Sequence, residues 1–244
     1  MIVPLTLSTD QVKNINGEIN LNDKTKKWIV FSHGFGVTRD DRGLFTDIGN
    51  ILKANYSLVY FDYCDLDSNG DLIVKTPGEQ VFRLDSVMGY IIEKYQPETI
   101  QIIAHSQGCL ITSLSKQLKR IKRLTMLTPP IEIYNPIKSM TRFKVRPGTV
   151  INLLGESKLR RADGSYTLVP REFIDEMSSL KPVEIYSRAN KLTEVTIIRA
   201  NQDEIINNLE WLNKKEFNQM AIDGDHNFTG NSRVKFLNLL ATEI

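Results

Sequence analysis

Ser106 is the first residue of this chain whose setting could support chemistry. It lies in the segment 104–108, Ala-His-Ser-Gln-Gly, between the apolar, β-branched run 100–103 and a helix-like segment at 109–114. The turn expected here is too tight for large side chains two residues before and after the serine, and it lifts the hydroxyl next to the positive end of a helix. Such a serine can act as a nucleophile once a base accepts its proton.

The chain contains three histidines, so the candidate bases can be compared one by one. His105 adjoins Ser106 on the tight turn, where neighbouring side chains point apart, so we do not expect it to be the base. His33 ends an early predicted strand within a glycine-rich loop. His226 follows the last predicted strand, at an edge of the sheet where ligand chemistry gathers in α/β proteins. We predict that His226 is the base, and the alternative is a histidine of a surface loop.

A carboxylate is needed to orient the imidazole and to stabilise its charged form. Asp203 fits best, because it follows the predicted strand 195–200 after a short turn. The adjacent Glu204 is the second choice. Asp223 and Asp225 are close to the histidine in sequence, but this is weak evidence of the right geometry, and we interpret them as solvated loop residues.

Two backbone N–H groups are needed to bind the oxyanion that forms during acyl transfer. One is predicted to be the amide of Gln107, which directly follows the nucleophile at the start of a helix. The other is assigned to the amide of Phe35, in the loop 32–36 after an early strand. Alone, the His-Gly-Phe-Gly stretch of this loop is equally consistent with an ordinary turn at the end of a strand.

Strands and helices alternate along most of the chain. Apolar, β-branched runs predict strands, and stripes of apolar residues predict helices, the clearest of which ends before Pro97. This alternation predicts an α/β fold with a mostly parallel central sheet and helices on both faces. Strands are predicted at 27–32, 58–61, 100–103, 124–127, 195–200 and 217–222.

Two short signals add local detail to this prediction. Asn16-Gly17 is a two-residue turn signal with apolar flanks, so a hairpin is expected over 11–21. Asp40 or Asp41 is a plausible N-cap for the first helix. Together these signals predict where the first strands and the first helix begin and end.

Composition limits the classes of protein to consider. The 244 residues suit a single domain over 1–244, and the formal net charge of +2 gives no reason to expect nucleic-acid binding. No run is long and apolar enough to cross a bilayer, and the first eight residues lack a basic leader and a secretory core. The two cysteines, Cys64 and Cys109, do not form a disulfide framework. We therefore expect a cytoplasmic protein with reduced thiols.

Together, these segments resemble the α/β-hydrolase superfamily. The resemblance rests on His-Gly-Phe-Gly at 33–36, the segment 104–108, Asp203 and Gly-Asp-His at 224–226, which span most of the chain. They occur in the order nucleophile, acid, base, which is one of the known triad orders. Within the superfamily, the chain is most similar to small bacterial esterases of the cinnamoyl/feruloyl type. The resemblance implies the α/β-hydrolase fold with a small cap insertion.

Two segments depart from the pattern of this family. Ala104 stands where the family usually has glycine, and its single methyl still permits the turn. After the strand that ends near Phe61 the family has a glycine-rich turn, whereas 63–70 here is Tyr-Cys-Asp-Leu-Asp-Ser-Asn-Gly. That loop borders the site in the family, so the family's substrate preference is not carried over.

The resemblance implies a carboxylic ester hydrolase that works through an acyl-enzyme. Ser106 attacks the acyl carbon, His226 takes its proton, Asp203 orients the imidazole, and water releases the acid. No metal or organic cofactor is implied, since the sequence has neither a clustered ligand set nor a dinucleotide-binding loop. The same machinery also cleaves thioesters, amides and some carbon–carbon bonds, so those activities stay open, as does a non-catalytic ligand-binding member of the fold.

The alternation breaks down over about 129–192, which we interpret as a cap insertion within the single domain. Between residues 138 and 161 of this span, Glu156 is the only acid beside seven basic residues, which form either a solvated face or a region that attracts an anionic ester. We expect a small-molecule ester as the partner, neither nucleic acid nor membrane insertion, and a homodimer as a possible assembly. The basic residues are Lys138, Arg142, Lys144, Arg146, Lys158, Arg160 and Arg161.

Overall fold

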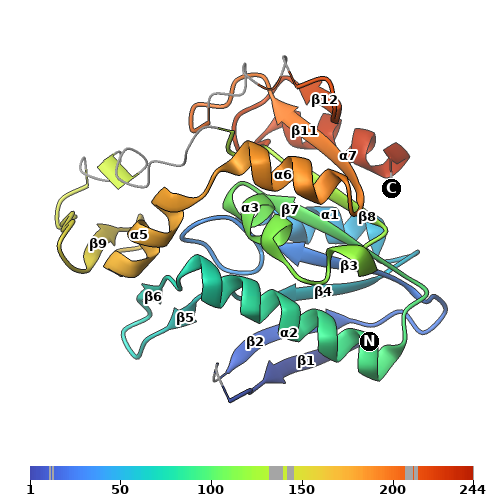
Figure 1. Cartoon of the computed structure of the whole chain (residues 1–244), viewed down its shortest axis with the longest axis horizontal. Coiled ribbons are helices and arrows are strands. Elements are labelled where there is room, and N and C mark those ends of the chain that lie inside the picture. The colour runs from blue at the N-terminus through green and yellow to red at the C-terminus, as the bar shows by residue number, and fades with distance from the viewer. Residues whose placement is uncertain are drawn as a thin grey trace.

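An eight-stranded sheet runs through the computed structural model, which describes residues 1–10, 12, 14–131, 140–141, 146–206, 211 and 214–243 (Figure 1). Its strands are Ile2–Leu7 (β1), Ile15–Asn20 (β2), Lys27–Ser32 (β3), Ser57–Phe61 (β4), Thr99–His105 (β7), Arg123–Leu127 (β8), Glu194–Ala200 (β11) and Asn218–Ile222 (β12). In space they follow the order β1-β2-β4-β3-β7-β8-β11-β12. The pairs β1–β2 and β2–β4 are antiparallel and the other neighbouring pairs are parallel, as the alternation of strands and helices predicted.

The parallel register brings the carboxyl ends of β3, β7, β8, β11 and β12 to one edge of the sheet. Ser32 at the end of β3 lies opposite Ala104, and His105 at the end of β7 lies opposite Leu127. In sheets of this kind, ligands bind outside the carboxyl ends of the strands. All of the predicted catalytic residues lie on chain segments that leave this edge.

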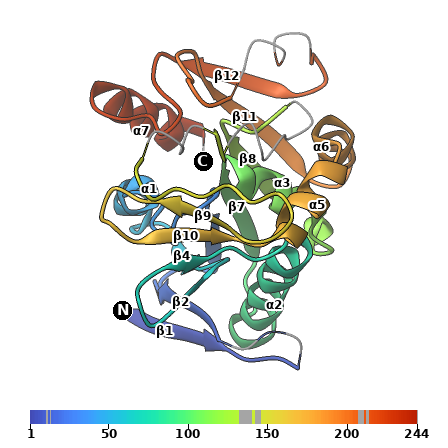
Figure 2. The same ribbon diagram turned by 90° about the vertical axis from the view of Figure 1, so that its left-hand side faces the viewer.

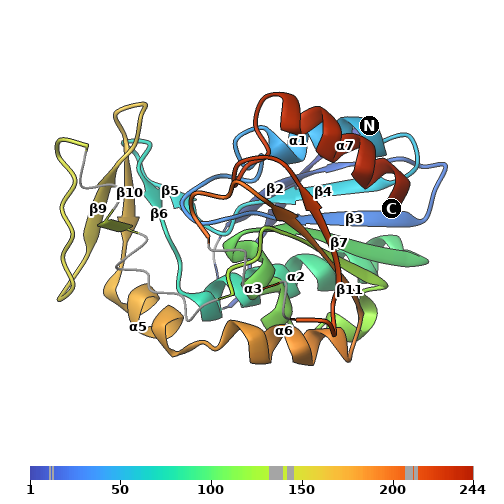
Figure 3. The same cartoon turned by 90° about the horizontal axis from the view of Figure 1, so that it is seen from above.

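Helices cover both faces of the sheet (Figure 3). Leu44–Leu52 (α1) and Asn231–Glu243 (α7) contact each other on one face. On the other face, Pro77–Tyr95 (α2) and Pro182–Asn190 (α6) pack on either side of Gln107–Leu114 (α3). Among the helices of the described residues, none has both the length and the apolar character needed to cross a bilayer.

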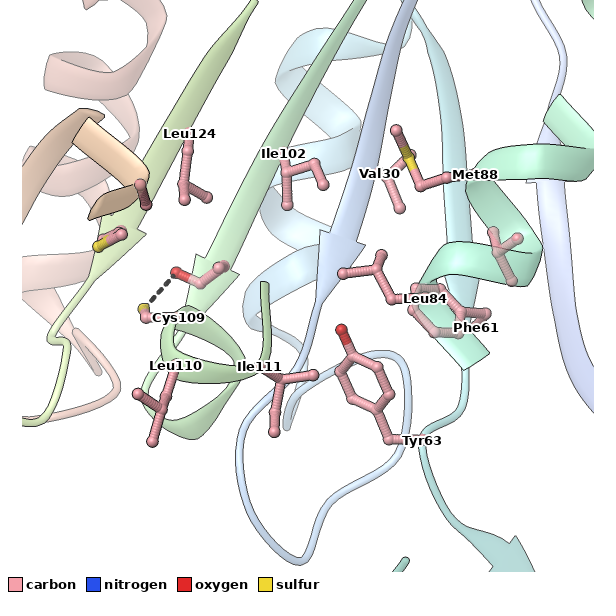
Figure 4. Packing of buried hydrophobic residues seen from close by; sticks show 14 of the residues in the cluster. Val30, Phe61, Tyr63, Leu84, Met88, Ile102, Cys109, Leu110, Ile111 and Leu124 are labelled. Carbon is pink, nitrogen blue, oxygen red and sulfur yellow. Dashed lines mark hydrogen bonds between the residues drawn. The ribbon is translucent and has the colours of Figure 1, made fainter. Parts of the chain in front are cut away.

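The larger part of the core lies between the sheet and α2 and α3 (Figure 4). Val30, Ile102 and Leu124 lie on three neighbouring strands and are fully buried. Leu84 and Met88 of α2 are buried in the same cluster. Burial of each such side chain stabilises the fold by about 1.5–3 kcal/mol relative to an exposed one. The strand that leads to Ser106 is therefore firmly packed in the core.

A second, four-stranded sheet lies apart from the first, in front of its strands in Figure 2. It consists of Asp65–Leu66 (β5), Leu72–Ile73 (β6), Ser157–Arg160 (β9) and Tyr166–Val169 (β10), in the order β5-β6-β10-β9. The pair β6–β10 is parallel and joins segments almost a hundred residues apart. Two of the four strands therefore come from the loop after β4, outside the expected cap insertion.

The expected cap insertion, 129–192, also contains Arg171–Ser179 (α5) and α6. Since α6 packs against α3, part of this span covers the main sheet. The boundaries of a cap remain a prediction.

The hairpin at the N-terminus differs from the one that the sequence predicted. Asn16 and Gly17 lie inside β2, and the antiparallel pair β1–β2 is joined by 8–14. Gly17 faces Phe61 of β4, and a Cβ at this position would overlap the backbone oxygen of Tyr60. The glycine therefore permits close pairing of strands, and the turn prediction is wrong.

The first helix also begins differently from the prediction. Its N-cap is Gly43, with φ of 81°, and none of the side chains that the structure describes caps α1. Asp40 and Asp41 do not cap it, so that prediction is wrong. The carboxylate of Asp41 is buried and lies in the candidate site instead.

Candidate active site

Ser106 occupies a strained turn between β7 and α3. Its backbone angles are φ 52° and ψ −123°, a conformation that costs a non-glycine residue free energy and is found mainly where function requires it. Gly108 permits this turn, since a Cβ there would overlap the carbonyl oxygen of Ser32 and lie 2.6 Å from that of His33. Ala104, the departure from the family pattern, is fully buried in β7.

Asp203 and His226 are joined by a short hydrogen bond at the same edge of the sheet. The Nδ1 atom of His226 lies 2.8 Å from Oδ2 of Asp203, and the two side chains are 4% and 1% exposed. The other oxygen of Asp203 accepts the amides of Ile205 and Ile206, both at 2.8 Å. These bonds fix the carboxylate and direct Oδ2 at the imidazole.

The hydrogen bond to Asp203 decides the tautomer of His226. Because Nδ1 faces a carboxylate it carries the proton in the neutral ring, which leaves the lone pair on Nε2. Burial lowers the pKa of His226 and outweighs the opposing hydrogen bond from Asp203. Burial alone would raise the pKa of Asp203, but its hydrogen bond to the imidazole holds that pKa below its ordinary value. The pair is thus a neutral imidazole beside an ionised carboxylate.

The segment that carries His226 packs against the residue that precedes the serine. The rings of His105 and His226 have centroids 4.9 Å apart, and Nε2 of His105 lies 3.1 Å from the backbone oxygen of His226. No hydrogen bond of the described residues joins the Ser106 hydroxyl to the imidazole. Such bonds are often long in a structure without substrate and tighten when substrate binds.

The loop after β3 lies against the serine. A Cβ on Gly34 would be 3.3 Å from Cβ of Ser106. The carbonyl oxygen of Gly34 is bound by Nδ1 of His33 at 2.9 Å, so in this planar trans peptide the N–H of Phe35 points the opposite way. Gln107 is the first residue of α3, where backbone N–H groups lack partners within the helix. The amides of Phe35 and Gln107 are therefore both near Ser106.

His33 has a structural role in this loop. Its Nε2 atom accepts the backbone N–H of Tyr63 at 2.9 Å, and its Nδ1 therefore donates to Gly34. Both ring nitrogens have partners, so His33 holds the loop in place and is not available as a base.

Asp41, which the sequence indicated only as a possible helix cap, joins two parts of the site through its carboxylate. Its Oδ2 atom accepts the amide of Gly34 at 3.0 Å and lies 2.8 Å from Nδ1 of His105. Nothing in the sequence distinguishes this residue from a helix cap, since its partner His105 is 64 residues away.

Arg161, which the sequence indicated only as one of the basic residues of the expected cap, links the second sheet to the loop after β3. It donates from Nη1 to the carbonyl oxygen of Gly36 at 3.0 Å. The side chain of Phe173 on α5 packs against Phe35, with ring centroids 5.3 Å apart. The small sheet and α5 thus fix the loop that carries the Phe35 amide.

His33, Asp62 and Cys64 form a cluster of residue types that bind metals, with their ligand atoms within 4.8 Å of one another. The nitrogens of His33 are already in use. Burial raises the pKa of Cys64 to about 12, so its thiol stays protonated. Asp62 accepts the backbone N–H and the guanidinium of Arg39. These partners make the cluster a poor fit for a metal ion.

A small cavity of about 10 Å³ lies beside the loop after β3. A cavity of this size has room for about one water molecule. Its lining includes Phe35, Tyr63, Gln80 and Gln107, so it adjoins both predicted oxyanion donors. The Oε1 atom of Gln107 is buried and has no hydrogen-bond partner among the described residues, while its Nε2 donates to Gln80 at 2.9 Å.

Known structures identify the fold. Est1E from Butyrivibrio proteoclasticus is 15% identical, with a TM-score of 0.71 over 98% of each chain, and another of its structures has ferulic acid bound. The Pyrococcus furiosus esterase Pf2001 is 14% identical, with a TM-score of 0.72 over 99% of this chain and 89% of that one. An esterase domain from Rhodothermus marinus is 14% identical, with a TM-score of 0.69 over 100% of this chain and 97% of that one. The chain has the α/β-hydrolase fold, and its predicted resemblance to small esterases is confirmed.

Sequence comparison gives a more distant relation. No protein-family model matches the chain. A probable lysophospholipase of Arabidopsis thaliana, BODYGUARD 2, is 28% identical over 118 residues. The match covers 45% of this chain and 24% of that protein, so this chain spans about a quarter of that relative's length.

Proposed function

We propose that this chain is a serine hydrolase that cleaves carboxylic esters through an acyl-enzyme. The observation that carries the proposal is the buried 2.8 Å bond between Asp203 and His226, on a segment packed against the strained turn of Ser106. The α/β-hydrolase fold and the esterases among its structural relatives support it. The sequence match to a probable lysophospholipase points to the same class of bond.

Each residue has one role in the proposed reaction. Nε2 of His226 takes the proton of the Ser106 hydroxyl as the oxygen attacks the ester carbonyl carbon. Asp203 stabilises the resulting imidazolium. The amides of Phe35 and Gln107 bind the oxyanion, and each such donor contributes about 3 kcal/mol in the transition state. The alcohol leaves with the proton from His226, and water then releases the acid by the same steps.

A burst experiment tests the acyl-enzyme directly. Mixing the protein with a p-nitrophenyl ester should release one p-nitrophenol per molecule rapidly, followed by slower turnover. Ser106→Ala should abolish the burst and reduce turnover by about 10⁶-fold, whereas Ser179→Ala, on the exposed end of α5, should keep both. A protein that binds the ester without any burst or turnover would be a non-catalytic member of the fold.

A substrate panel separates the remaining activities. Short and long acyl esters, a lysophospholipid, an acyl thioester and an anilide should be compared by kcat/KM. We propose that esters are preferred, and the lysophospholipid belongs in the panel because of the match to BODYGUARD 2. A higher kcat/KM for the thioester or the anilide would replace the ester assignment while leaving the serine mechanism in place.

The basic residues of the expected cap are a second element of the proposal. Lys138, Arg142 and Lys144 lie outside the described residues. Arg160 stacks over the ring of Tyr166, with its guanidinium 4.7 Å from the ring centroid. An attraction of these residues for anionic esters predicts a kcat/KM that falls with salt for anionic esters but not for neutral ones. The same salt dependence of kcat/KM for anionic and neutral esters would contradict a role of these basic residues in attracting substrate.

A further inference from the structure

Three chain segments of the proposed active site are joined by one buried pair, Asp41 and His105. The Oδ2 atom of Asp41 accepts the amide of Gly34, next to the proposed oxyanion donor. The same oxygen lies 2.8 Å from Nδ1 of His105, which directly precedes the nucleophile. The other nitrogen of His105 lies 3.1 Å from the backbone oxygen of His226. The pair thus touches the oxyanion loop, the nucleophile turn and the base.

The partners of His105 require a charged ring. A carboxylate and a backbone carbonyl can only accept hydrogen bonds, so both ring nitrogens of His105 must donate. A neutral imidazole carries one N–H and would face one of these oxygens with a lone pair. The two side chains are each 2% exposed, so water cannot replace the missing bond. The geometry therefore fits an imidazolium paired with a carboxylate.

We propose that His105 is a permanently protonated positioning residue, which with Asp41 holds the oxyanion loop and the base in register with Ser106 and keeps His226 neutral. The proposal rests on the proposed function only where it assigns His226 as the base. His105 itself touches no reacting atom. Its charge acts on His226 through the contact between their rings, whose centroids are 4.9 Å apart.

The charges around the pair support this assignment. Burial opposes a charge on His105, but the charge of Asp41 and its hydrogen bond outweigh burial and raise the pKa of His105. Burial and the charge of His105 both lower the pKa of His226. Among the described residues, His33, Asp203 and the buried thiol of Cys109 also interact electrostatically with the pair.

Nitrogen NMR of the wild-type protein tests the protonation state directly. The chain has three histidines, so a ¹⁵N-histidine spectrum is simple to assign, with His105→Gln removing one set of signals. At pH 8 we expect a doubly protonated ring for His105 and a neutral ring for His226. A neutral ring at His105 at this pH would overturn the proposal. Because this measurement needs no substrate, it stands or fails separately from the esterase assignment.

The pH profile tests the effect on the base. In His105→Gln the repulsion from the imidazolium is lost while Asp41 remains, so the acid limb of kcat/KM should move to higher pH by about one to two units. Asp41→Asn removes the partner charge and lets His105 become neutral, so its shift should be smaller. Asp40→Asn, the same change at an exposed neighbouring residue, should leave the profile as in wild type. An unshifted acid limb in folded His105→Gln would contradict a role beyond packing.

Discussion

Asp203→Asn is the substitution that separates orientation of the base from mere packing. Asparagine has nearly the shape of aspartate. Its remaining oxygen can still accept the amides of Ile205 and Ile206, which lie 2.8 Å from Oδ1 of Asp203 in this structure. The change therefore replaces only the oxygen that faces His226 with an NH₂ group. Opposite a donor, Nδ1 of His226 must become an acceptor, and its proton moves to Nε2.

The size of the effect follows from this tautomer. A base with its proton on Nε2 cannot accept the proton of Ser106, and the developing imidazolium also loses its carboxylate. Both effects act only on the transition state, so kcat should fall by about 10⁴-fold while KM stays close to that of wild type. At about 1.4 kcal/mol for each factor of ten, this is a loss of about 5.5 kcal/mol of transition-state stabilisation.

The assay is steady-state hydrolysis of a p-nitrophenyl ester near pH 8, with two control variants. Asp223→Asn makes the same change at an exposed residue whose partner is Asn201, and it should retain near wild-type activity. Glu204→Gln tests the second candidate acid, which accepts the backbone N–H of His226 at 3.3 Å. A collapse of activity in Glu204→Gln, with Asp203→Asn within tenfold of wild type, would refute the assignment of the acid.

Three further predictions concern the turn, the base and the loop after β3. Gly108→Ala places a Cβ against the carbonyl oxygen of Ser32 and should lower the free energy of unfolding by about 2–3 kcal/mol in urea denaturation, so unchanged stability would contradict the close approach. Burial lowers the pKa of His226, which must be neutral to act, so kcat/KM should fall only below pH 6.5; a midpoint above that value would count against this base. Arg161→Ala removes the hydrogen bond to the carbonyl of Gly36 and should lower kcat/KM by about three- to tenfold. Arg171→Ala, at an exposed position, should leave kcat/KM unchanged. Equal kcat/KM values for the two variants would show that the bond between Arg161 and Gly36 does not affect the loop.

The sequence predicted the parts of this structure that depend on local pattern. The strand before Ser106 and the helix after it follow from apolar runs, and the small residues at 104 and 108 identify the turn between them. The proximity of Asp203 to His226 follows from topology, since both residues come after strands whose carboxyl ends share one edge.

Contacts between segments that are distant in the chain could not be predicted from local sequence patterns. The turn signal at Asn16-Gly17 is typical of a hairpin, but pairing with β4 required glycine at that position and placed both residues in a strand. Asp41 has the sequence setting of a helix cap, and only the fold brings it to His105. The parallel pair β6–β10 joins two short strands far apart in the chain, which no local pattern indicates.

Covalent labelling followed by peptide mass mapping tests the central claim most directly. A fluorophosphonate reacts with a serine only where a base activates the hydroxyl and an oxyanion site accepts the phosphonyl oxygen. We expect one adduct per molecule, on the peptide that contains Ser106, lost in Ser106→Ala and strongly slowed in His226→Gln. An unlabelled protein that is folded, or an adduct on another serine, would contradict the proposed active site.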